Sequence, residues 1–114
     1  MILVIGGRGS GKRAWTARHL GLTPEEMETA CRPGGTVLCN LQDREPLPPL
    51  EELLNKQAVI CDEIGCGIVP IDRADENWRE SVGRLCCALA QKADAVVRVI
   101  AGVPQFIKGE QPSR

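Results

Sequence analysis

The segment GGRGSGKR, from Gly6 to Arg13, follows the apolar run MILVI and has residue types that could bind phosphate. Gly6, Gly11 and Lys12 match the phosphate-binding loop G-x-x-x-x-G-K-[ST] at every position except its last. Glycines let backbone N–H groups turn toward phosphate oxygens, and a following helix adds the partial positive charge of its N-terminus. We therefore expect Lys12 to contact the β- and γ-phosphates of a nucleotide triphosphate. The expected nucleotide-binding residues are Gly6, Gly7, Arg8, Gly9, Ser10, Gly11, Lys12 and Arg13.

Arg13 stands where this loop normally has serine or threonine, whose hydroxyl is a ligand of Mg²⁺. An arginine has no lone pair to offer a metal ion, although it can hold phosphate through paired hydrogen bonds. The sequence therefore predicts phosphate binding with a weakened Mg²⁺ site, in which water could replace the lost ligand. GTP and ATP are both candidates, because the loop contacts phosphates and not the base.

Asp62 and Glu63 follow the apolar run AVIC and form a second candidate site. An acidic strand end opposite a phosphate loop can hold Mg²⁺ through its waters, so we expect Asp62 to be the metal ligand. The predicted catalytic residues are Lys12, Asp62 and Glu63, with Asp62 or Glu63 holding the metal or taking the proton of an acceptor hydroxyl. The alternative is a solvated acidic turn. His19, the one histidine of the chain, is expected to be a surface or half-buried residue rather than a base.

Apolar runs alternate with helical patterns along the chain, which is typical of a parallel sheet with crossover helices. We predict a three-layer α/β fold like that of phosphate-loop NTPases, with a mostly parallel sheet of about four strands, in a single nucleotide-binding domain of residues 1–114. Thr23 and Glu26 form an expected capping box, and the tail VPQFIKGEQPSR is expected to fray. The expected strands are 2–5, 36–41, 58–61 and 95–102, and the expected helices run to about 20, from 23 to before 33, over about 50–56 and over about 72–92.

Composition narrows the possible partners. The 114 residues carry a net charge of -1, and aromatic residues are scarce, so we expect no nucleic-acid partner. No apolar run is long enough for a membrane span, and we expect a cytoplasmic protein with reduced thiols. The six cysteines are then expected to pack as small apolar residues. The alternative of a zinc site from Cys61 and Cys66 lacks a second ligand pair.

The second half of the chain, from DEIGCGIVP to VPQFIK, resembles the C-terminal half of the bifunctional adenosylcobinamide kinase/adenosylcobinamide-phosphate guanylyltransferases. That family has the turn N/D-E-V/I-G-x-G-I-V-P, a helix with R-x-x-x-D/E-x-x-G, a strand A-D-x-V and the segment V-x-G-x-P-x-x-x-K. The opening ILVIGGRGSGK is similar to its I-L-V-T-G-G-x-R-S-G-K-S. The matching positions in the second half are Glu63, Gly65, Gly67, Ile68, Val69, Pro70, Arg79, Gly83, Ala93, Asp94, Val96, Gly102, Pro104 and Lys108.

The resemblance implies a role in cobalamin (vitamin B12) biosynthesis. Members phosphorylate the corrinoid adenosylcobinamide with GTP or ATP, then transfer GMP through a guanylyl-histidine, and assemble as homotrimers. Here LTPEEMETACRPGG replaces the family's histidine-bearing helix, and TVLCNLQ lacks its acidic residue, so we expect the guanylyltransferase step to be lost. Three alternatives stay open: a shortened kinase-like enzyme, a non-catalytic nucleotide- or corrinoid-binding assembly subunit, and a folded product without a function.

Overall fold

The computed structural model describes residues 1–63 and 73–109, with side chains described from residue 77 onward in the second range. Five strands form one sheet in the order β2-β3-β1-β4-β5, in which β1 to β4 are parallel and β5 is antiparallel to β4. The strands are β1 (Ile2–Gly6), β2 (Val37–Leu38), β3 (Ala58–Asp62), β4 (Ala95–Ile100) and β5 (Val103–Lys108). The helices are α1 (Lys12–Leu20), α2 (Pro24–Ala30), the 3₁₀ helix η1 (Leu41–Asp43), α3 (Leu50–Leu54) and α4 (Arg73–Lys92).

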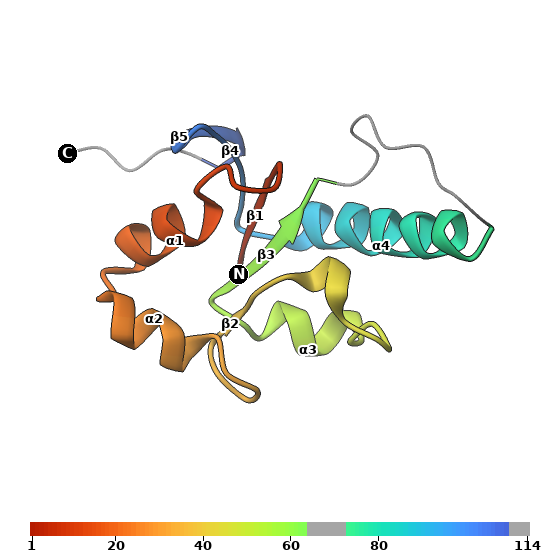
Figure 1. Cartoon of the computed structure of the whole chain (residues 1–114), viewed down its shortest axis with the longest axis horizontal. Coiled ribbons are helices and arrows are strands. Elements are labelled where there is room, and N and C mark those ends of the chain that lie inside the picture. Colours follow the sequence, from red (N-terminus) through yellow and green to blue (C-terminus); the bar gives the residue numbers. More distant parts are fainter. Residues whose placement is uncertain (64–72, 110–114) are drawn as a thin grey trace.

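Helices cover both faces of the sheet, which confirms the expected three-layer α/β architecture (Figure 1). Ile2 and Val4 of β1 belong to the apolar cluster under α1 and α2, whereas Leu3 belongs to the cluster under α3 and α4. This alternation is the period of two that a strand imposes on its side chains. Because the inner strands are covered on both faces, they have nearly continuous apolar sequences. Among the described helices, none is long and apolar enough to cross a membrane.

The sheet has one more strand than the sequence predicted, because the segment after β4 forms β5 instead of a frayed tail. Ala101 and Gly102 both have positive φ, 49° and 78°, and close a two-residue hairpin between paired Ile100 and Val103. Pro104 is tolerated there because β5 is an edge strand. The second predicted strand is shorter than expected, since only Val37–Leu38 pairs with β3.

The predicted capping box at the start of α2 is confirmed. The Glu26 backbone N–H donates to the Thr23 hydroxyl at 3.1 Å, and the Thr23 backbone N–H donates to Glu26 Oε1 at 3.0 Å. The hydrogen bond from the Thr23 backbone lowers the pKa of Glu26. Both interactions satisfy N–H groups that the first turn of a helix leaves without partners.

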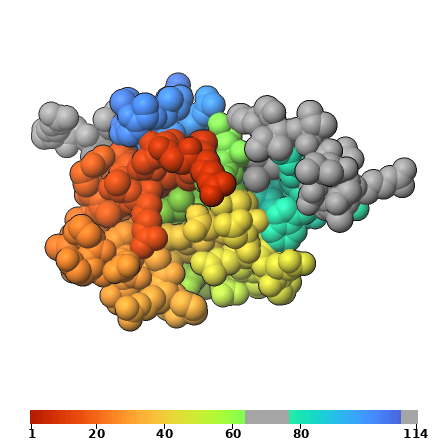
Figure 2. Space-filling model, in the orientation of Figure 1, coloured from red at the N-terminus to blue at the C-terminus, as the bar shows by residue number. Residues whose placement is uncertain are grey.

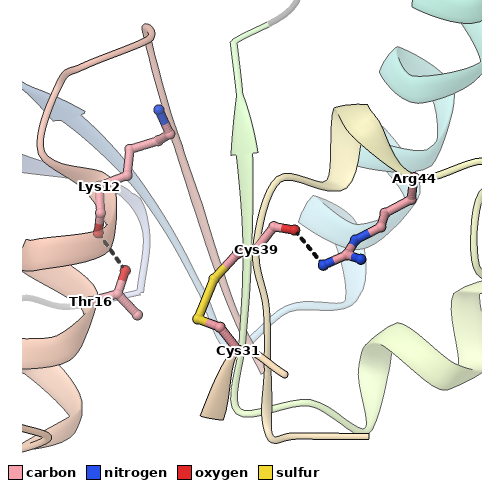
Figure 3. Close-up of a disulfide and its surroundings, with 5 residues drawn as sticks. All are labelled: Lys12, Thr16, Cys31, Cys39 and Arg44. Carbon is pink, nitrogen blue, oxygen red and sulfur yellow. Dashed lines mark hydrogen bonds between the residues drawn. A yellow bond between two sulfur atoms is a disulfide. The ribbon is translucent and has the colours of Figure 1, made fainter. Parts of the chain in front are cut away.

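The expectation that all cysteines are reduced is wrong for Cys31 and Cys39, which form a disulfide (Figure 3). Cys31 is the C-terminal cap of α2, and Cys39 directly follows β2. The packing of α2 beside β2 brings their Cα atoms to 5.9 Å, within the usual range for a disulfide. The Arg44 guanidinium donates to the Cys39 carbonyl at 3.0 Å on the other side. Spacing along the sequence carried no signal for this pairing.

Replacing Cys31 with serine is expected to lower the free energy of unfolding by about 2.5 kcal/mol, because the disulfide restricts the unfolded chain. Urea unfolding without a reductant measures this difference. Cys87→Ser is the matched control, because Cys87 is a free, exposed cysteine and its replacement should leave the stability unchanged. Equal stability of wild type and Cys31→Ser under oxidising conditions would contradict the prediction.

Candidate functional site

The glycine loop joins β1 to α1 at the carboxyl edge of the sheet, as the sequence predicted. Gly9 and Gly11 have φ values of 77° and 92°, a left-handed conformation that favours glycine. Gly11 is also the N-cap of α1 and gives no side-chain hydrogen bond to its first turn. The first N–H groups of the nine-residue α1 are therefore left for an anion, to which the helix N-terminus presents a partial positive charge.

Lys12 lies beneath this loop and contacts Asp62 at the end of β3, the acidic strand end that the sequence predicted to lie opposite the loop. Its side chain is buried, and Nζ lies 2.8 Å from Asp62 Oδ1 and donates to the Gly7 carbonyl at 2.8 Å. The contact follows from the register of the sheet, in which Gly6 pairs with Asp62. An ammonium group has three donors, so a third remains for a phosphate oxygen.

Asp62 and Glu63, which the sequence left as alternatives, have different surroundings. Asp62 lines the cavity beside the glycine loop, whereas Glu63 is not among the residues of that cavity. Arg98 of β4 holds Glu63 with two contacts, Nε to Oε1 at 2.7 Å and a guanidinium N–H to Oε2 at 3.0 Å. The Glu63 backbone N–H also donates to the Gly6 carbonyl at 2.8 Å. Glu63 therefore joins β4 to β3 across β1.

The cavity has a volume of about 460 Å³. Figure 2 shows it as a hollow between the red glycine loop and the yellow segment near residue 40, with green atoms of β3 at its floor. The far wall, which comes from Cys39, Asn40 and η1, was not predicted. Its full lining is Arg8, Gly9, Ser10, Gly11, Lys12, Arg13, Ala14, Cys39, Asn40, Gln42, Asp43, Ile60 and Asp62.

Gln42 is a residue of this wall that the sequence analysis missed. Its side-chain oxygen accepts the Asp62 backbone N–H at 2.9 Å, and its backbone carbonyl accepts the Trp78 indole N–H at 2.9 Å. Gln42 thus connects α4 to the strand end that carries the carboxylate. The polar run NLQD after an apolar strand is the only signal that could have indicated it, and that run is equally typical of a turn.

The β4–β5 hairpin supports the glycine loop from the other side. The Gly102 backbone N–H donates to the Ser10 carbonyl at 2.7 Å, and the Ser10 N–H donates to Gly7 at 3.1 Å. Within the described residues, the buried Ser10 hydroxyl has no hydrogen-bond partner. A buried hydroxyl without a partner is costly, and a phosphate oxygen would satisfy it. This hydroxyl and the free N–H groups of α1 are consistent with an anionic ligand in the cavity.

Carboxylates suited to Mg²⁺ are few at this site. Asp62 and Asp43 line the cavity, and the residues with described side chains contain no group of three His, Cys, Asp or Glu that could hold a metal. One or two carboxylates together with nucleotide phosphates are a usual Mg²⁺ environment, so these residues fit a metal that arrives with its nucleotide. Arg13 is exposed and lines the cavity mouth, where it offers no metal ligand.

The remaining sequence candidates have structural surroundings or lie outside the described residues. His19 stacks on Trp15, with ring centroids 4.8 Å apart, away from the cavity lining. Cys61 is a buried free cysteine, and a hydrogen bond with Cys86 together with burial raises the pKa of its thiol. Cys66, its suggested zinc partner, and the G-x-G-I-V-P turn lie within residues 64–72, outside the described ranges.

Comparison with known proteins shows the family to which the chain belongs. The model of the family cobinamide kinase / cobinamide phosphate guanyltransferase matches residues 42–107, more than half of the chain. The chain belongs to this family. It is also similar to the bifunctional adenosylcobalamin biosynthesis protein CobP of Pseudomonas aeruginosa, at 31% identity over 61 residues. That alignment covers 54% of this chain and 35% of the relative, so the chain matches about a third of the relative's length.

Proposed function

We propose that this protein acts in cobalamin biosynthesis as an adenosylcobinamide kinase-like protein that binds GTP or ATP in the cavity beside the glycine loop. The observation that carries the proposal is the ion pair of the buried Lys12 with the half-buried Asp62, beneath a loop that opens directly into a helix N-terminus. The family match begins at Gln42, after the loop. The proposed phosphate site therefore rests on its own geometry, and the corrinoid substrate rests on the family.

In the proposed reaction, the loop N–H groups hold the β-phosphate and the Lys12 ammonium neutralises charge on the transferring phosphoryl group. A hydroxyl oxygen of the acceptor attacks the γ-phosphorus while the bond to the β-phosphate oxygen breaks, the hydroxyl proton passes to the Asp62 carboxylate, and the nucleoside diphosphate leaves. Asp62 would hold Mg²⁺ through its waters, and the metal would supply further charge neutralisation when bound. Glu63, held by Arg98, links the end of β3 to β4 beside the loop.

The same proposal includes the loss of the guanylyl-transfer step. The only histidine of the chain, His19, stacks on Trp15 instead of lining the cavity, and the family's histidine-bearing element is absent from the sequence. Cytoplasmic location and assembly as a homotrimer belong to this proposal and stay predictions.

A second candidate function is a non-catalytic nucleotide- or corrinoid-binding subunit of the same pathway. Arg13 favours it, because an exposed guanidinium at the cavity mouth replaces a metal ligand with a positive charge.

Calorimetric titration with GTP, ATP and inorganic tripolyphosphate, each with and without Mg²⁺, tests the binding of phosphate in the cavity, which both proposals share. An assay of phosphoryl transfer to adenosylcobinamide separates them. A kinase is expected to bind nucleotide more tightly with Mg²⁺ and to transfer phosphate to adenosylcobinamide. A binding subunit is expected to bind equally well without Mg²⁺ and to transfer none. Failure of all three ligands to bind would contradict the kinase and the nucleotide-binding subunit, and would leave only a corrinoid-binding subunit.

Arg13→Ser is expected to strengthen the Mg²⁺-dependent part of nucleotide binding by about tenfold, because a serine hydroxyl can be a ligand of Mg²⁺ and an arginine cannot. Residues around a metal change its affinity by about 10- to 100-fold, and part of the gain is lost with the Arg13–phosphate contact. Titration of GTP at several Mg²⁺ concentrations measures it. Arg84→Ser on the exposed face of α4 is the matched control and should leave binding unchanged. Weaker Mg²⁺-dependent binding by Arg13→Ser would show that the guanidinium is a necessary phosphate ligand.

A further inference from the structure

A second depression lies between α1 and α2, which are neighbouring helices on one face of the sheet (Figure 1). Its volume is about 690 Å³, and it shares Arg13 and Ala14 with the phosphate cavity. The two spaces therefore adjoin each other at the first turn of α1. We call this depression the α1–α2 groove; it is lined by Arg13, Ala14, Ala17, Arg18, Leu22, Pro24, Glu25, Met27 and Glu28.

The groove has an apolar floor and walls of opposite charge. Arg13 and Arg18 come from α1, and Glu25 and Glu28 come from α2. Within the described ranges, none of these four side chains has an ion-pair partner. The intervening Glu26 is occupied by the capping box and does not line the groove. A ligand that fills this groove must therefore offer anionic groups at one end, an apolar face, and hydrogen-bond donors toward α2.

We propose that the α1–α2 groove binds the nucleoside part of a nucleotide whose phosphates lie in the cavity, and that Glu25 and Glu28 select guanine over adenine. The inference rests on the proposed function, which supplies the phosphate end. From Arg13 to Arg18, α1 rises about 7.5 Å, a distance that a ribose and a base together can fill. The base then lies against the apolar floor, and its polar edge faces the two carboxylates.

The preference for guanine follows from the donors at the edge of each base. Ionised glutamates only accept hydrogen bonds. Guanine offers adjacent N1–H and N2–H donors to such an acceptor, whereas adenine offers its N6 amino group beside an N1 that is itself an acceptor. A carboxylate facing adenine would therefore oppose one lone pair with another. A well-formed paired contact between a side chain and a base discriminates by about 5- to 150-fold, and the exposed position of Glu25 and Glu28 favours the lower part of this range.

The test compares dissociation constants for GTP, ATP and inorganic tripolyphosphate in wild type and in the double variant Glu25→Gln/Glu28→Gln. Both glutamates are exposed, so the variant should keep its fold. We expect wild type to prefer GTP to ATP by about tenfold, and the variant to lose most of that ratio through weaker GTP binding. Tripolyphosphate affinity should stay unchanged, because it has no base. Glu51→Gln on α3, which lines neither space, is the matched control and should keep the wild-type ratio.

Four outcomes would overturn the inference. Equal affinity of wild type for GTP and ATP, or an unchanged ratio in the double variant, contradicts it and leaves the proposed function standing, since tripolyphosphate still reports the phosphate site. Weaker binding of adenosylcobinamide by the double variant, with an unchanged nucleotide ratio, would assign the groove to the acceptor instead. Failure of tripolyphosphate and both nucleotides to bind would contradict the proposed function itself and the inference with it.

Discussion

Lys12→Ala is expected to weaken binding of GTP and of inorganic tripolyphosphate by about 30- to 5000-fold, because truncating one partner of a hydrogen-bonded charge pair across a binding interface, here the expected pair of Lys12 with phosphate, costs about 2–5 kcal/mol of binding. The truncation removes the positive group closest to the expected phosphates. It also leaves the Asp62 carboxylate without the cation 2.8 Å away, so that its negative charge faces an anionic ligand. The Gly7 carbonyl loses its donor as well.

Calorimetric titration measures this loss, and the second variant Lys12→Ala/Asp62→Asn separates its two causes. Neutralising Asp62 removes the repulsion and should recover part of the affinity in the Lys12→Ala background. Lys92→Ala on the exposed end of α4 is the matched control for loss of a lysine charge, and its affinity should equal that of wild type. An affinity of Lys12→Ala within threefold of wild type would show that phosphate binds elsewhere.

The part of the site that could be predicted from the sequence is the part held by one continuous unit, β1, the glycine loop and α1. A buried parallel strand requires a run of apolar residues, and the loop requires glycine where φ is positive. The helix α1 then begins at Lys12, directly after the last glycine of the loop. These requirements are local, so residues 2–20 reveal them directly. The approach of Asp62 to Lys12 could also be predicted, because parallel strands bring their carboxyl ends to the same edge of a sheet.

The other parts of the site depend on contacts between segments that are distant in the sequence. The sequence around Gln42 has no pattern that indicates its role. Its side-chain oxygen nevertheless accepts the backbone N–H of Asp62, which is 20 residues away in the sequence. Glu63 could be placed at the end of its strand, but its pairing with Arg98 of β4 across β1 follows from the strand order. The Cys31–Cys39 disulfide likewise follows from the packing of α2 beside β2. Alternation of apolar residues predicts which face a residue occupies and not which neighbour it meets.

The β4–β5 hairpin makes a contact with the glycine loop that the sequence analysis missed. The segment after β4 was predicted to fray because its end is polar, and Ala101 and Gly102 were not recognised as a two-residue turn. That turn places the Gly102 N–H on the Ser10 carbonyl, so β5 and the glycine loop support each other. The hairpin therefore supports the proposed phosphate site, although none of its residues lines the cavity.

Gly6→Ala is expected to lower the free energy of unfolding by about 1–3 kcal/mol, as overpacking of a well-packed site does. A Cβ at Gly6 would lie 2.5 Å from the Val99 carbonyl oxygen and 2.6 Å from the Ser10 hydroxyl oxygen. The carbonyl belongs to β4 and cannot move without disturbing the sheet. The glycine loop must therefore shift away from β4, and the same substitution should weaken tripolyphosphate binding.

Gly7→Ala is the matched control, because a Cβ at the neighbouring Gly7 meets no atom within 4 Å. Urea unfolding on both variants measures the stability of the loop against β4, and tripolyphosphate titration measures its affinity for phosphate. If Gly6→Ala loses stability and affinity together while Gly7→Ala keeps its stability, the contact of the loop with β4 sets the geometry of the phosphate site. If Gly6→Ala is as stable as wild type, the loop can move away from Val99 at no cost, and the close approach of β1 and β4 at this edge is not what holds the loop in place.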